Sequence, residues 1–450
     1  MIELLRRAGR DNPDQTAVVT PRGSTTFHEL QESAERVAAN LVSLGIERFA
    51  VLDDDAAHVM AILAGSALAG AESCVYPLAA TDEAVAENRE RFDHTHLISS
   101  RESLIAAGAI DANDVLNENG APRIPVASAD APLLVMTSGT TTGQPRAVRN
   151  TWDRILRQVD RIEPTPDHRW LLAYGINQFG GLQILIHVLA AQATLVVGET
   201  FQPRDGLTAM RRWDVTHASG TPTFWRFLLV EMRGDGGPTP ELRQVTMSGE
   251  AIPPTLLEQV REQSPRAKVS QIYAATEFGQ AITVRDGVAG LPTSMLDANA
   301  DLAFKVVDDE LWVRSRAAML GYYGEDPFDS DEWRATGDLV EIVGDRVEFR
   351  GRKTEVINVG GVKIHPLPIE DRISRVPGVA LVRAFGRPNA MVGAIVAVEV
   401  VTSPGYHDDD VDAQIRATCA DLPPAARPRS IRFVETFDMT GNKISRGAPR

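Results

Sequence analysis

The sequence contains little cysteine, little lysine and no long apolar run. Its two cysteines, Cys74 and Cys419, are far apart in the 450 residues, which argues against a disulfide framework or a cysteine-based zinc site and fits a reducing compartment, the cytoplasm. The most apolar stretches, 59–71 and 182–197, are short or interrupted by polar residues, so we expect no membrane span. The first 15 residues lack an apolar core, and we expect no secretory signal.

The chain is acidic overall. It has 46 basic and 61 acidic residues and a formal net charge of −15, and such a surface repels phosphate backbones, which argues against a nucleic-acid partner. Only five of the basic residues are lysines, at positions 268, 305, 353, 363 and 443. A lysine in a chemical motif therefore carries more weight here than in most proteins. The content of 43% hydrophobic and 24% charged residues is that of a globular protein.

The order of strand-like and helix-like segments predicts an α/β fold. Apolar residues recur at helical spacing over 26–44 and over 152–162, so we expect a helix in each range. Short β-rich runs between residues 133 and 273 alternate with helical patterns, which is typical of parallel sheets covered by helices on both faces.

After about residue 300 the pattern changes, which predicts two domains. Two hairpin signals follow one another up to residue 349, and from Pro366 a separate set of strands and helices begins. We expect a large N-terminal domain, 1–351, with parallel-rich sheets and a hairpin-rich part. The small, mobile α+β C-terminal domain would comprise residues 352–450.

The segment 137–146, TSGTTTGQPR, directly follows an apolar strand expected at 133–136. Its glycines let backbone N–H groups turn toward one point and its hydroxyls add donors, so the segment can wrap an anion such as a polyphosphate. It is not a Walker A loop, because no Gly-Lys-Ser/Thr follows. Taken alone, a run of Thr, Ser, Gly and Pro is more often a plain surface loop than a binding site.

Four further features carry chemically useful side chains. Thr276 and Glu277 follow a predicted strand, where a hydroxyl can donate to a phosphate and a carboxylate can hold Mg²⁺. The Asp338 carboxylate can accept hydrogen bonds from both ribose hydroxyls, and Arg352 follows it across a predicted hairpin. Lys443 is a rare lysine in a glycine-containing loop and can act as a point charge for a phosphate. Singly, each also fits a bland structural role.

In their order and spacing, these segments resemble the adenylate-forming superfamily, which includes acyl-CoA synthetases, aryl acid ligases, luciferases and the adenylation domains of peptide synthetases. The resemblance covers nearly the whole chain. Its landmarks are TSGTTTGQPRAV (137–148), AYGINQFGGLQ…LAAQATLVV (173–197), GTPTFWRFL (220–228), MSGEAIPPTLLEQ (247–259), YAATE (273–277), ELWVRSRAAMLGYY (310–323), TGDL (336–339), GRKTEVINVGGVKIHPLPIE (351–370) and TGNKISR (440–446).

The resemblance implies that a carboxylic acid attacks the α-phosphate of ATP, giving an acyl-adenylate and pyrophosphate, and that the adenylate then passes to a thiol or an amine. ATP, Mg²⁺ and CoA are the implied cofactors and co-substrates. The residues implied to cradle the β- and γ-phosphates are Thr137, Ser138, Gly139, Thr140, Thr141, Thr142, Gly143 and Arg146.

The resemblance also implies roles for single side chains. Thr276 would contact the α-phosphate, Glu277 would bind Mg²⁺, and Asp338 with Arg352 beside it would hold the ribose. Lys443 would bridge the attacking carboxylate and the α-phosphate, where a positioned ammonium group stabilises charge that develops in the transition state.

The implied acid pocket is bordered by nucleotide-binding residues. Further nucleotide contacts are expected from Gly249, Glu250, Tyr273 and Ala274. The acid pocket is expected among Gln178, Phe179, Gly180, Ser248 and Ala275, where aromatic and small residues together favour an aromatic or medium-sized apolar acid. After the small domain rotates, Gly361 would line a tunnel for pantetheine.

This chain departs from the family pattern at four places. The phosphate segment has one extra Thr, with Arg146 where Lys is usual. Thr354 occupies the hinge position, which is usually Asp or Lys. The Asn177-Gln178-Phe179 stretch replaces an aromatic-His pair, and Asn442 replaces the Gly that usually precedes the catalytic lysine. None of these removes a group that adenylation requires.

Three readings of the function follow. The first is an acid–CoA ligase. The second is an enzyme that loads the activated acid onto a separate carrier protein or an amine, since we expect no carrier domain within a chain that ends four residues after Arg446. The third, of a different class, is a non-catalytic adenylate-binding relative, which the retention of Lys443, Glu277, Asp338 and Arg352 argues against. The sequence leaves the acid, the acceptor and the oligomeric state open.

Overall fold

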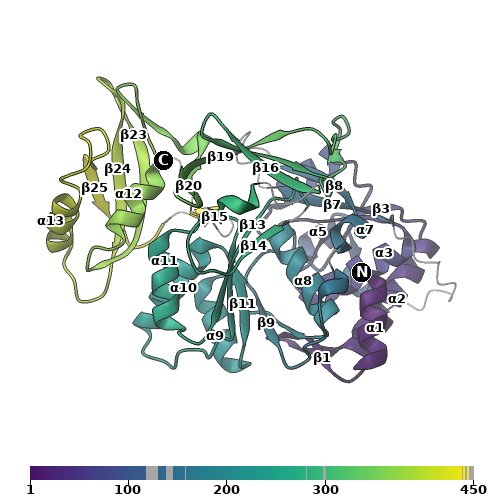
Figure 1. Ribbon diagram of the computed structural model, residues 1–450. Coiled ribbons are helices and arrows are strands. Elements are labelled where there is room, and N and C mark those ends of the chain that lie inside the picture. The colour runs from purple at the N-terminus through teal and green to yellow at the C-terminus, as the bar shows by residue number, and fades with distance from the viewer. Residues whose placement is uncertain are drawn as a thin grey trace.

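The computed structural model describes residues 1–117, 130–137, 145–157, 159–279, 281–296, 301–437, 439–440 and 443–444. A large N-terminal domain holds three sheets, and a smaller C-terminal domain holds a fourth (Figure 1). None of the helices in this described part of the chain is long and apolar enough to cross a membrane.

The first sheet has eight strands in the order β14-β13-β12-β11-β9-β10-β1-β2, of which the six from β13 to β1 run parallel. Antiparallel strands β14 and β2 close the two edges. The strands are β1 (Thr16–Thr20), β2 (Gly23–Thr26), β9 (Arg169–Leu172), β10 (Thr194–Val196), β11 (His217–Gly220), β12 (Gln244–Ser248), β13 (Lys268–Ala274) and β14 (Ala281–Val284).

The second sheet has seven strands in the order β18-β8-β7-β4-β3-β5-β6, parallel from β7 to β6. Its strands are β3 (Arg48–Leu52), β4 (Glu72–Val75), β5 (His96–Ser99), β6 (Ile110–Asp111), β7 (Pro132–Thr137), β8 (Arg146–Thr151) and β18 (Gly321–Tyr322). The expectation of parallel-rich sheets is thus confirmed.

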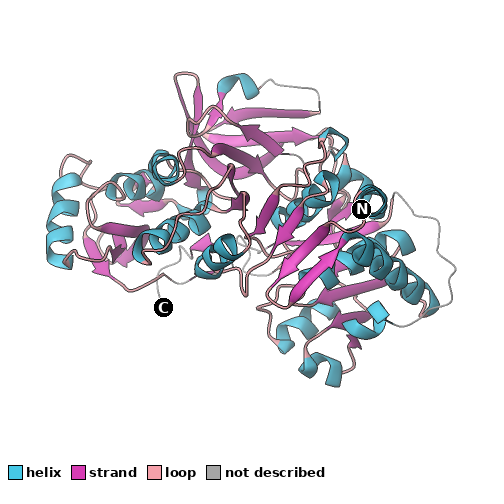
Figure 2. Ribbon diagram, turned by 90° about the horizontal axis from the view of Figure 1, so that it is seen from below, coloured by secondary structure: helices cyan, strands magenta, loops and turns pink. Residues whose placement is uncertain are grey.

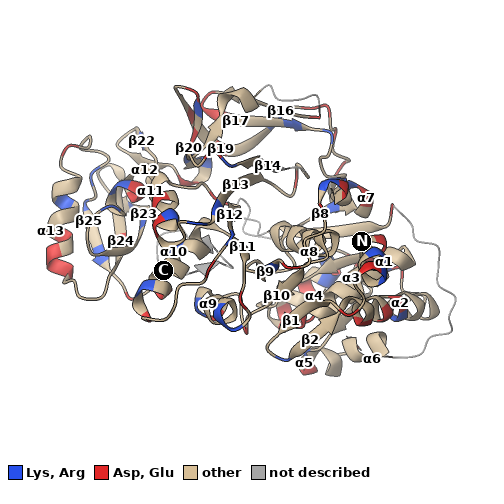
Figure 3. Ribbon diagram, turned by 60° about the horizontal axis from the view of Figure 1, so that its bottom comes forward, with Lys and Arg blue, Asp and Glu red and all other residues tan. Residues whose placement is uncertain are grey.

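Helices of the N-terminal domain pack on these two sheets. They are α1 (Ile2–Asp11), α2 (Phe27–Ser43), α3 (Ala56–Ala69), α4 (Asp82–Arg91), α5 (Glu102–Ala106), α6 (Ala112–Asn117), α7 (Trp152–Leu156), α8 (Phe179–Ala191), α9 (Pro203–Arg212), α10 (Pro222–Gly234) and α11 (Pro254–Gln263). Helices α3 and α8 carry no charged residue (Figure 3) and belong to one apolar core shared by both sheets. That core fixes the two sheets against each other.

Local sequence explains where these helices begin and end. Helix α2 begins at a capping box in which the Thr26 hydroxyl accepts from the Glu29 backbone N–H and the Glu29 carboxylate accepts from the Thr26 N–H. The helix expected over 152–162 is shorter than predicted, because α7 ends at Leu156 and a single 3₁₀ turn follows at Val159–Arg161. A short helix and a turn can present the same apolar spacing as one long helix.

The third sheet is antiparallel and follows the order β15-β20-β19-β17-β16. Its strands are β15 (Leu291–Pro292), β16 (Leu302–Val307), β17 (Glu310–Ser315), β19 (Arg334–Val343) and β20 (Arg346–Arg352). Both predicted hairpins lie here, and Figure 2 shows this sheet as a strand-rich body beside the helix-covered parts.

The C-terminal domain is an α+β unit. Its sheet runs β22-β21-β24-β23, with β25 also paired to β24, and a two-stranded hairpin follows. The elements are β21 (Ile357–Val359), β22 (Val362–Ile364), α12 (Pro366–Ile373), β23 (Val379–Asn389), β24 (Gly393–Thr402), α13 (Asp408–Thr418), β25 (Ser430–Phe433), β26 (Met439–Thr440) and β27 (Lys443–Ile444).

The two domains touch at α10 and α11. The Asp371 carboxylate of α12 accepts from the Thr255 hydroxyl of α11 at 2.6 Å, and Arg375 pairs with Glu258 at 3.2 Å. Beside this polar contact, the ring of Phe437 meets Phe227 of α10 edge to face, with 6.4 Å between centroids. The small domain is therefore docked by a modest, mixed surface.

Candidate active site

The two ends of the predicted phosphate segment are held together by strand pairing. Thr137, the last residue of β7, pairs with Arg146, the first residue of β8. The Thr137 hydroxyl donates to the Arg146 carbonyl at 3.4 Å. Ser138, Gly139, Thr140, Thr141, Thr142 and Gly143 lie outside the described residues. The described ends of the segment, Thr137 and Arg146, therefore lie opposite each other in the β7–β8 pair.

Glu277 and Arg146 are brought together through a tyrosine. The Tyr322 hydroxyl donates to Glu277 Oε1 at 3.0 Å, and the Arg146 guanidinium lies 3.3 Å from the centre of the Tyr322 ring. Arg146 also binds the Glu325 carboxylate at 2.5 and 2.6 Å. Burial, and then the Glu277 charge, raise the pKa of Tyr322, so its hydroxyl stays a donor.

Asp338 sits in a second cluster at the end of β13. Its Oδ2 accepts from the Tyr273 hydroxyl at 2.7 Å, and its Oδ1 lies 3.0 Å from Arg352 Nε. Arg352 also donates to the Thr336 carbonyl at 2.9 Å. The Tyr273 ring stacks on Phe349 with 5.2 Å between centroids, and burial, followed by the Asp338 charge, raises the Tyr273 pKa well above its ordinary value. Each carboxylate oxygen keeps acceptor capacity beyond these contacts.

The segment after β13 joins the two clusters. Ala274 is the last residue of β13, and Ala275, Thr276 and Glu277 follow it in a half-buried turn. Thr276 thus lies in sequence between Tyr273, which binds Asp338, and Glu277, which binds Tyr322. Such a row of polar groups at the carboxyl end of a parallel strand is where ligands of open α/β sheets bind.

Tyr174, which follows β9, brings together two of the predicted acid-pocket residues, Gly180 near the start of α8 and Ser248 at the end of β12, whereas Ala275 follows β13 and packs on the core of the third sheet. The Tyr174 hydroxyl lies 2.8 Å from Ser248 Oγ, and burial raises the pKa of Tyr174 to about 12. A Cβ on Gly180 would lie 3.2 Å from the Tyr174 ring, so glycine lets the helix start close to it. Gln178, the N-cap of α8, and Phe179, its first residue, are half-buried.

Gly249 and Glu250 follow β12 on the same side of the sheet. Gly249 has a φ of +85°, a left-handed conformation that favours glycine. The Glu250 Oε2 accepts from the Thr223 N–H at 3.2 Å and from its hydroxyl at 2.8 Å, which fastens this loop to the N-terminus of α10. A carboxylate is favourable at that end of a helix.

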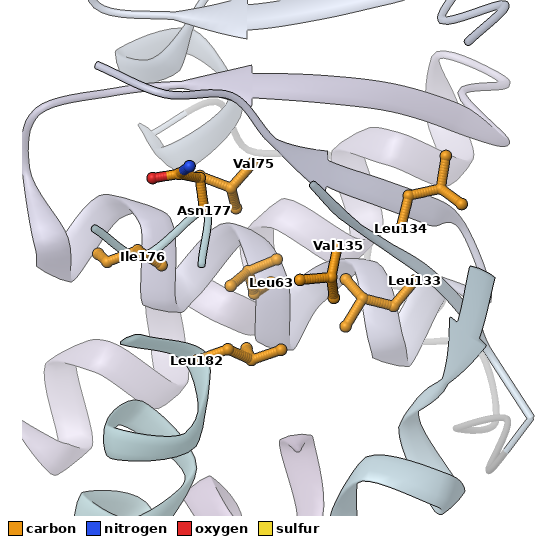
Figure 4. A pocket seen from close by; sticks show the side chains of 8 residues that line it. All are labelled: Leu63, Val75, Leu133, Leu134, Val135, Ile176, Asn177 and Leu182. Carbon is orange, nitrogen blue, oxygen red and sulfur yellow. The ribbon is translucent and has the colours of Figure 1, made fainter. Parts of the chain in front are cut away.

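A small apolar cavity lies beside Ile176 and Asn177, just before α8 (Figure 4). Asn177 is the one polar residue among the eight that line it. The lining residues are Leu63, Val75, Leu133, Leu134, Val135, Ile176, Asn177 and Leu182. The stretch that replaces the family's aromatic-His pair therefore borders an apolar space through Asn177.

The two predicted residues of the C-terminal domain lie apart from each other. Lys443 begins β27, which pairs with β26 and lies beside α10. Gly361 lies at the exposed tip of the β21–β22 hairpin with a φ of +90°, in a sheet separate from the strands that carry Asp338 and Glu277. The backbone therefore brings Lys443, but not Gly361, to the helix that starts beside the site.

The described ranges contain no group of three or more His, Cys, Asp and Glu side chains arranged to hold a metal ion. His94 is a buried histidine with a structural partner. Its Nδ1 lies 2.7 Å from the Tyr76 hydroxyl, and burial lowers its pKa to about 3. Among the candidate residues, Glu277 supplies the carboxylate oxygens that a hard cation such as Mg²⁺ prefers.

Comparison with known proteins identifies the class. A family model described as "AMP-binding enzyme" matches residues 5–323, and one described as "AMP-binding enzyme C-terminal domain" matches residues 368–443. The two matches follow one another along the chain and together cover most of it. The chain belongs to the AMP-binding enzyme family, which confirms the resemblance found in the sequence.

Similar proteins include CoA ligases. The chain is 26% identical to the 3-((3aS,4S,7aS)-7a-methyl-1,5-dioxo-octahydro-1H-inden-4-yl)propanoyl:CoA ligase of Mycobacterium tuberculosis, over 96% of this chain and 94% of that protein. It is 25% identical to a feruloyl-CoA synthase of Amycolatopsis, over 99% and 97%. The structure of the anthranilate CoA ligase AuaEII with anthranoyl-AMP superposes with a TM-score of 0.84 at 20% identity, covering 98% and 95%, and so shares the fold.

Four side chains of the site were missed by sequence reasoning. Tyr322 contacts Glu277, Tyr174 contacts Ser248, Glu325 binds Arg146, and Thr223 binds Glu250. Tyr174, Thr223 and Tyr322 stand inside the family landmarks, which is the one signal that could have selected them. The two members of each of the four contacts are far apart in the sequence, up to 179 residues for Arg146 and Glu325, so spacing along the chain does not predict these contacts.

Proposed function

We propose that the protein is an AMP-forming acid–CoA ligase that activates a carboxylic acid with ATP and transfers it to CoA. The observation that carries the proposal is the Asp338 carboxylate, held by Tyr273 and Arg352 beside the turn that bears Thr276 and Glu277. Its two oxygens offer about four acceptor positions, of which these contacts use two. The remaining two fit the pair of ribose hydroxyls.

The neighbouring groups fit the rest of ATP. Thr276 would donate to the α-phosphate, and Arg146 with the segment 137–143 would hold the β- and γ-phosphates. The Arg146 guanidinium, now paired with Glu325, supplies the charge that lysine supplies in the usual pattern. Glu277, held in orientation by Tyr322, fits Mg²⁺, which when bound neutralises phosphate charge.

The proposed catalytic group is Lys443. Its ammonium would stabilise charge on the phosphoryl oxygens while the carboxylate attacks the α-phosphate. The position of β27 beside α10 supports an arrangement in which the tail lies against the N-terminal domain during adenylation. Rotation of the C-terminal domain against the N-terminal domain about Thr354 would then withdraw Lys443 and bring Gly361 forward to line the pantetheine path.

The acid is proposed to be aromatic or of medium size and apolar. Tyr174, Phe179 and Gly180, with the apolar cavity beside Asn177, support this class. CoA is the acceptor favoured here. A carrier-bound pantetheine is an alternative, because its thiol would reach the site by the same route as the thiol of CoA, and an amine is a further alternative. The sparse, buried cysteines support a reducing compartment, the cytoplasm.

Pyrophosphate release from ATP and a panel of aryl and alkyl acids tests the proposal, with product masses recorded with and without CoA. We expect Lys443→Ala to slow pyrophosphate release by about 100-fold or more, the scale of losing one strong charge stabiliser. Lys268→Ala, at the exposed start of β13, is the matched control and should be unaffected. Near-normal release from Lys443→Ala would contradict the assignment. Release without a CoA product would favour the carrier or amine reading, and no release with any acid would favour a binding-only protein.

A further inference from the structure

The strand ladder holds Asp338 on one side only, because it pairs with Arg352 of β20 but lies in a bulge on the side that faces β17. Trp312 of β17 pairs with Ala335 of β19, and Glu310 pairs with Leu339, so residues 336–338 lie opposite Leu311 alone. Gly337, in the middle of the bulge, has a φ of +75°. Backbone groups in such a bulge need partners outside the ladder.

Glu310 supplies one of these partners and has a second contact. Its Oε1 accepts from the Gly337 N–H at 3.1 Å, and its Oε2 binds Lys353 Nζ at 2.9 Å. The Glu310 side chain is 9% exposed, whereas that of Lys353 is 66% exposed. A carboxylate this deeply buried is held in place by both bonds, because losing either leaves charge or an amide uncompensated.

These contacts close a ring around the ribose-binding turn. Gly337 precedes Asp338, Asp338 binds Arg352, Lys353 follows Arg352, and Lys353 returns to Gly337 through Glu310. Lys353 also begins the 3₁₀ turn Lys353–Glu355 that contains the hinge position, Thr354. The ring thus joins the nucleotide site to the residue directly before the hinge.

We propose that Glu310 is a positioning residue that fixes the Asp338 turn for the ribose and, through Lys353, couples nucleotide binding to order in the hinge. The inference rests on the proposed function, since it takes Asp338 as the ribose ligand. While the ring is closed, residues 352 and 353 stay with the N-terminal domain, and rotation occurs from Thr354 onward. Nucleotide held by Asp338 then stiffens the start of the hinge.

Direct AMP binding by calorimetry tests the first half. We expect Glu310→Ala to bind AMP about tenfold more weakly, because it leaves the Gly337 N–H without its acceptor. Glu310→Gln retains an acceptor oxygen and should stay within about threefold of the wild type. A Glu310→Ala protein with wild-type AMP affinity would overturn the positioning role.

Hydrogen exchange of residues 353–356 at saturating AMP tests the second half. In the wild type, AMP should slow exchange of these amides. In Glu310→Gln and Lys353→Met this protection should fall to less than about half, because the charge pair to Lys353 is weakened or lost while the Arg352 contact remains. Glu341→Gln is the control, since Glu341 pairs with Arg350 on the same hairpin outside the ring.

The outcomes separate this inference from the proposed function. A wild-type protein that binds no AMP would overturn both. A wild-type protein that binds AMP, with undiminished hinge protection in Glu310→Gln and Lys353→Met, would overturn the coupling alone. The same loss of protection in Glu341→Gln would also overturn it, because any ion pair of the hairpin would then suffice. Since exchange is compared at saturation, a weaker affinity does not mimic a loss of coupling.

Discussion

Removing the Tyr273 hydroxyl isolates one contact of the ribose cluster. Tyr273→Phe keeps the ring, which stacks on Phe349 and meets Phe304 at 6.0 Å, and deletes only the O–H that donates to Asp338 at 2.7 Å. The aromatic core around β13 is therefore preserved. Any change in nucleotide binding reports on the orientation of the Asp338 carboxylate.

The size of the effect follows from the surroundings of Asp338. A hydrogen bond to a charged group contributes about 1.5–3 kcal/mol. The Asp338 side chain is 14% exposed and keeps its bond to Arg352, so a water molecule can partly replace the lost Tyr273 donor. We therefore expect the free energy of unfolding to fall by about 1.5 kcal/mol, the lower end of this range. Part of the same free energy is needed to orient the Asp338 carboxylate when AMP binds. We therefore expect AMP to bind about fivefold to tenfold more weakly.

Calorimetry with AMP and urea unfolding measure the two quantities. Tyr406→Phe, at a half-exposed tyrosine of the C-terminal domain, is the matched control and should match the wild type in both. Because the Tyr273 pKa is raised well above its ordinary value, its hydroxyl remains protonated and the difference in AMP affinity should be constant from about pH 6 to pH 9. Unchanged AMP affinity in a stably folded Tyr273→Phe protein would refute the reasoning.

Two further predictions concern the metal ligand and the pH dependence of stability. Tyr322→Phe should raise the Mg²⁺ concentration for half-maximal pyrophosphate release by about tenfold, because Glu277 loses the donor that orients it; an unchanged Mg²⁺ titration would count against that role. Burial lowers the pKa of His187 to about 4 and of His217 to about 3 from 6.5, so below pH 6.5 the unfolded state binds more protons than the folded state. Stability should therefore be full above pH 6.5 and fall as the pH drops to about 4; urea unfolding at steps of pH checks this, and His217→Gln should flatten the slope.

The general fold could be predicted because its elements are encoded locally. The spacing in 26–44 and the Thr26 and Glu29 pair give helix α2 almost to the residue. Turn residues 308–309 and 344–345 mark the two hairpins of the third sheet. The expected helix over 152–162 failed because apolar spacing does not report where hydrogen bonding changes from α to 3₁₀.

Sequence reasoning selects candidate residues for the site but not the contacts among them. The family landmarks select Asp338, Glu277 and Arg352, yet the bulge around Gly337 and the Glu310–Lys353 pair depend on how two strands align. Lys353 stood out only as a rare lysine. We expected Tyr273 among the nucleotide contacts, but the sequence gives no sign that its hydroxyl donates to Asp338, which follows from the position of β13 against Phe349 of the third sheet.

Helix α10 has a consequence for any effort to change the acid that this enzyme accepts. Its first turn holds Glu250 through Thr223, and its middle carries Phe227 against Phe437 of the small domain. Because α10 is one continuous helix, a shift of its first turn at Thr223 also moves Phe227. We therefore expect substitutions near Thr223 to alter also how the C-terminal domain packs against α10.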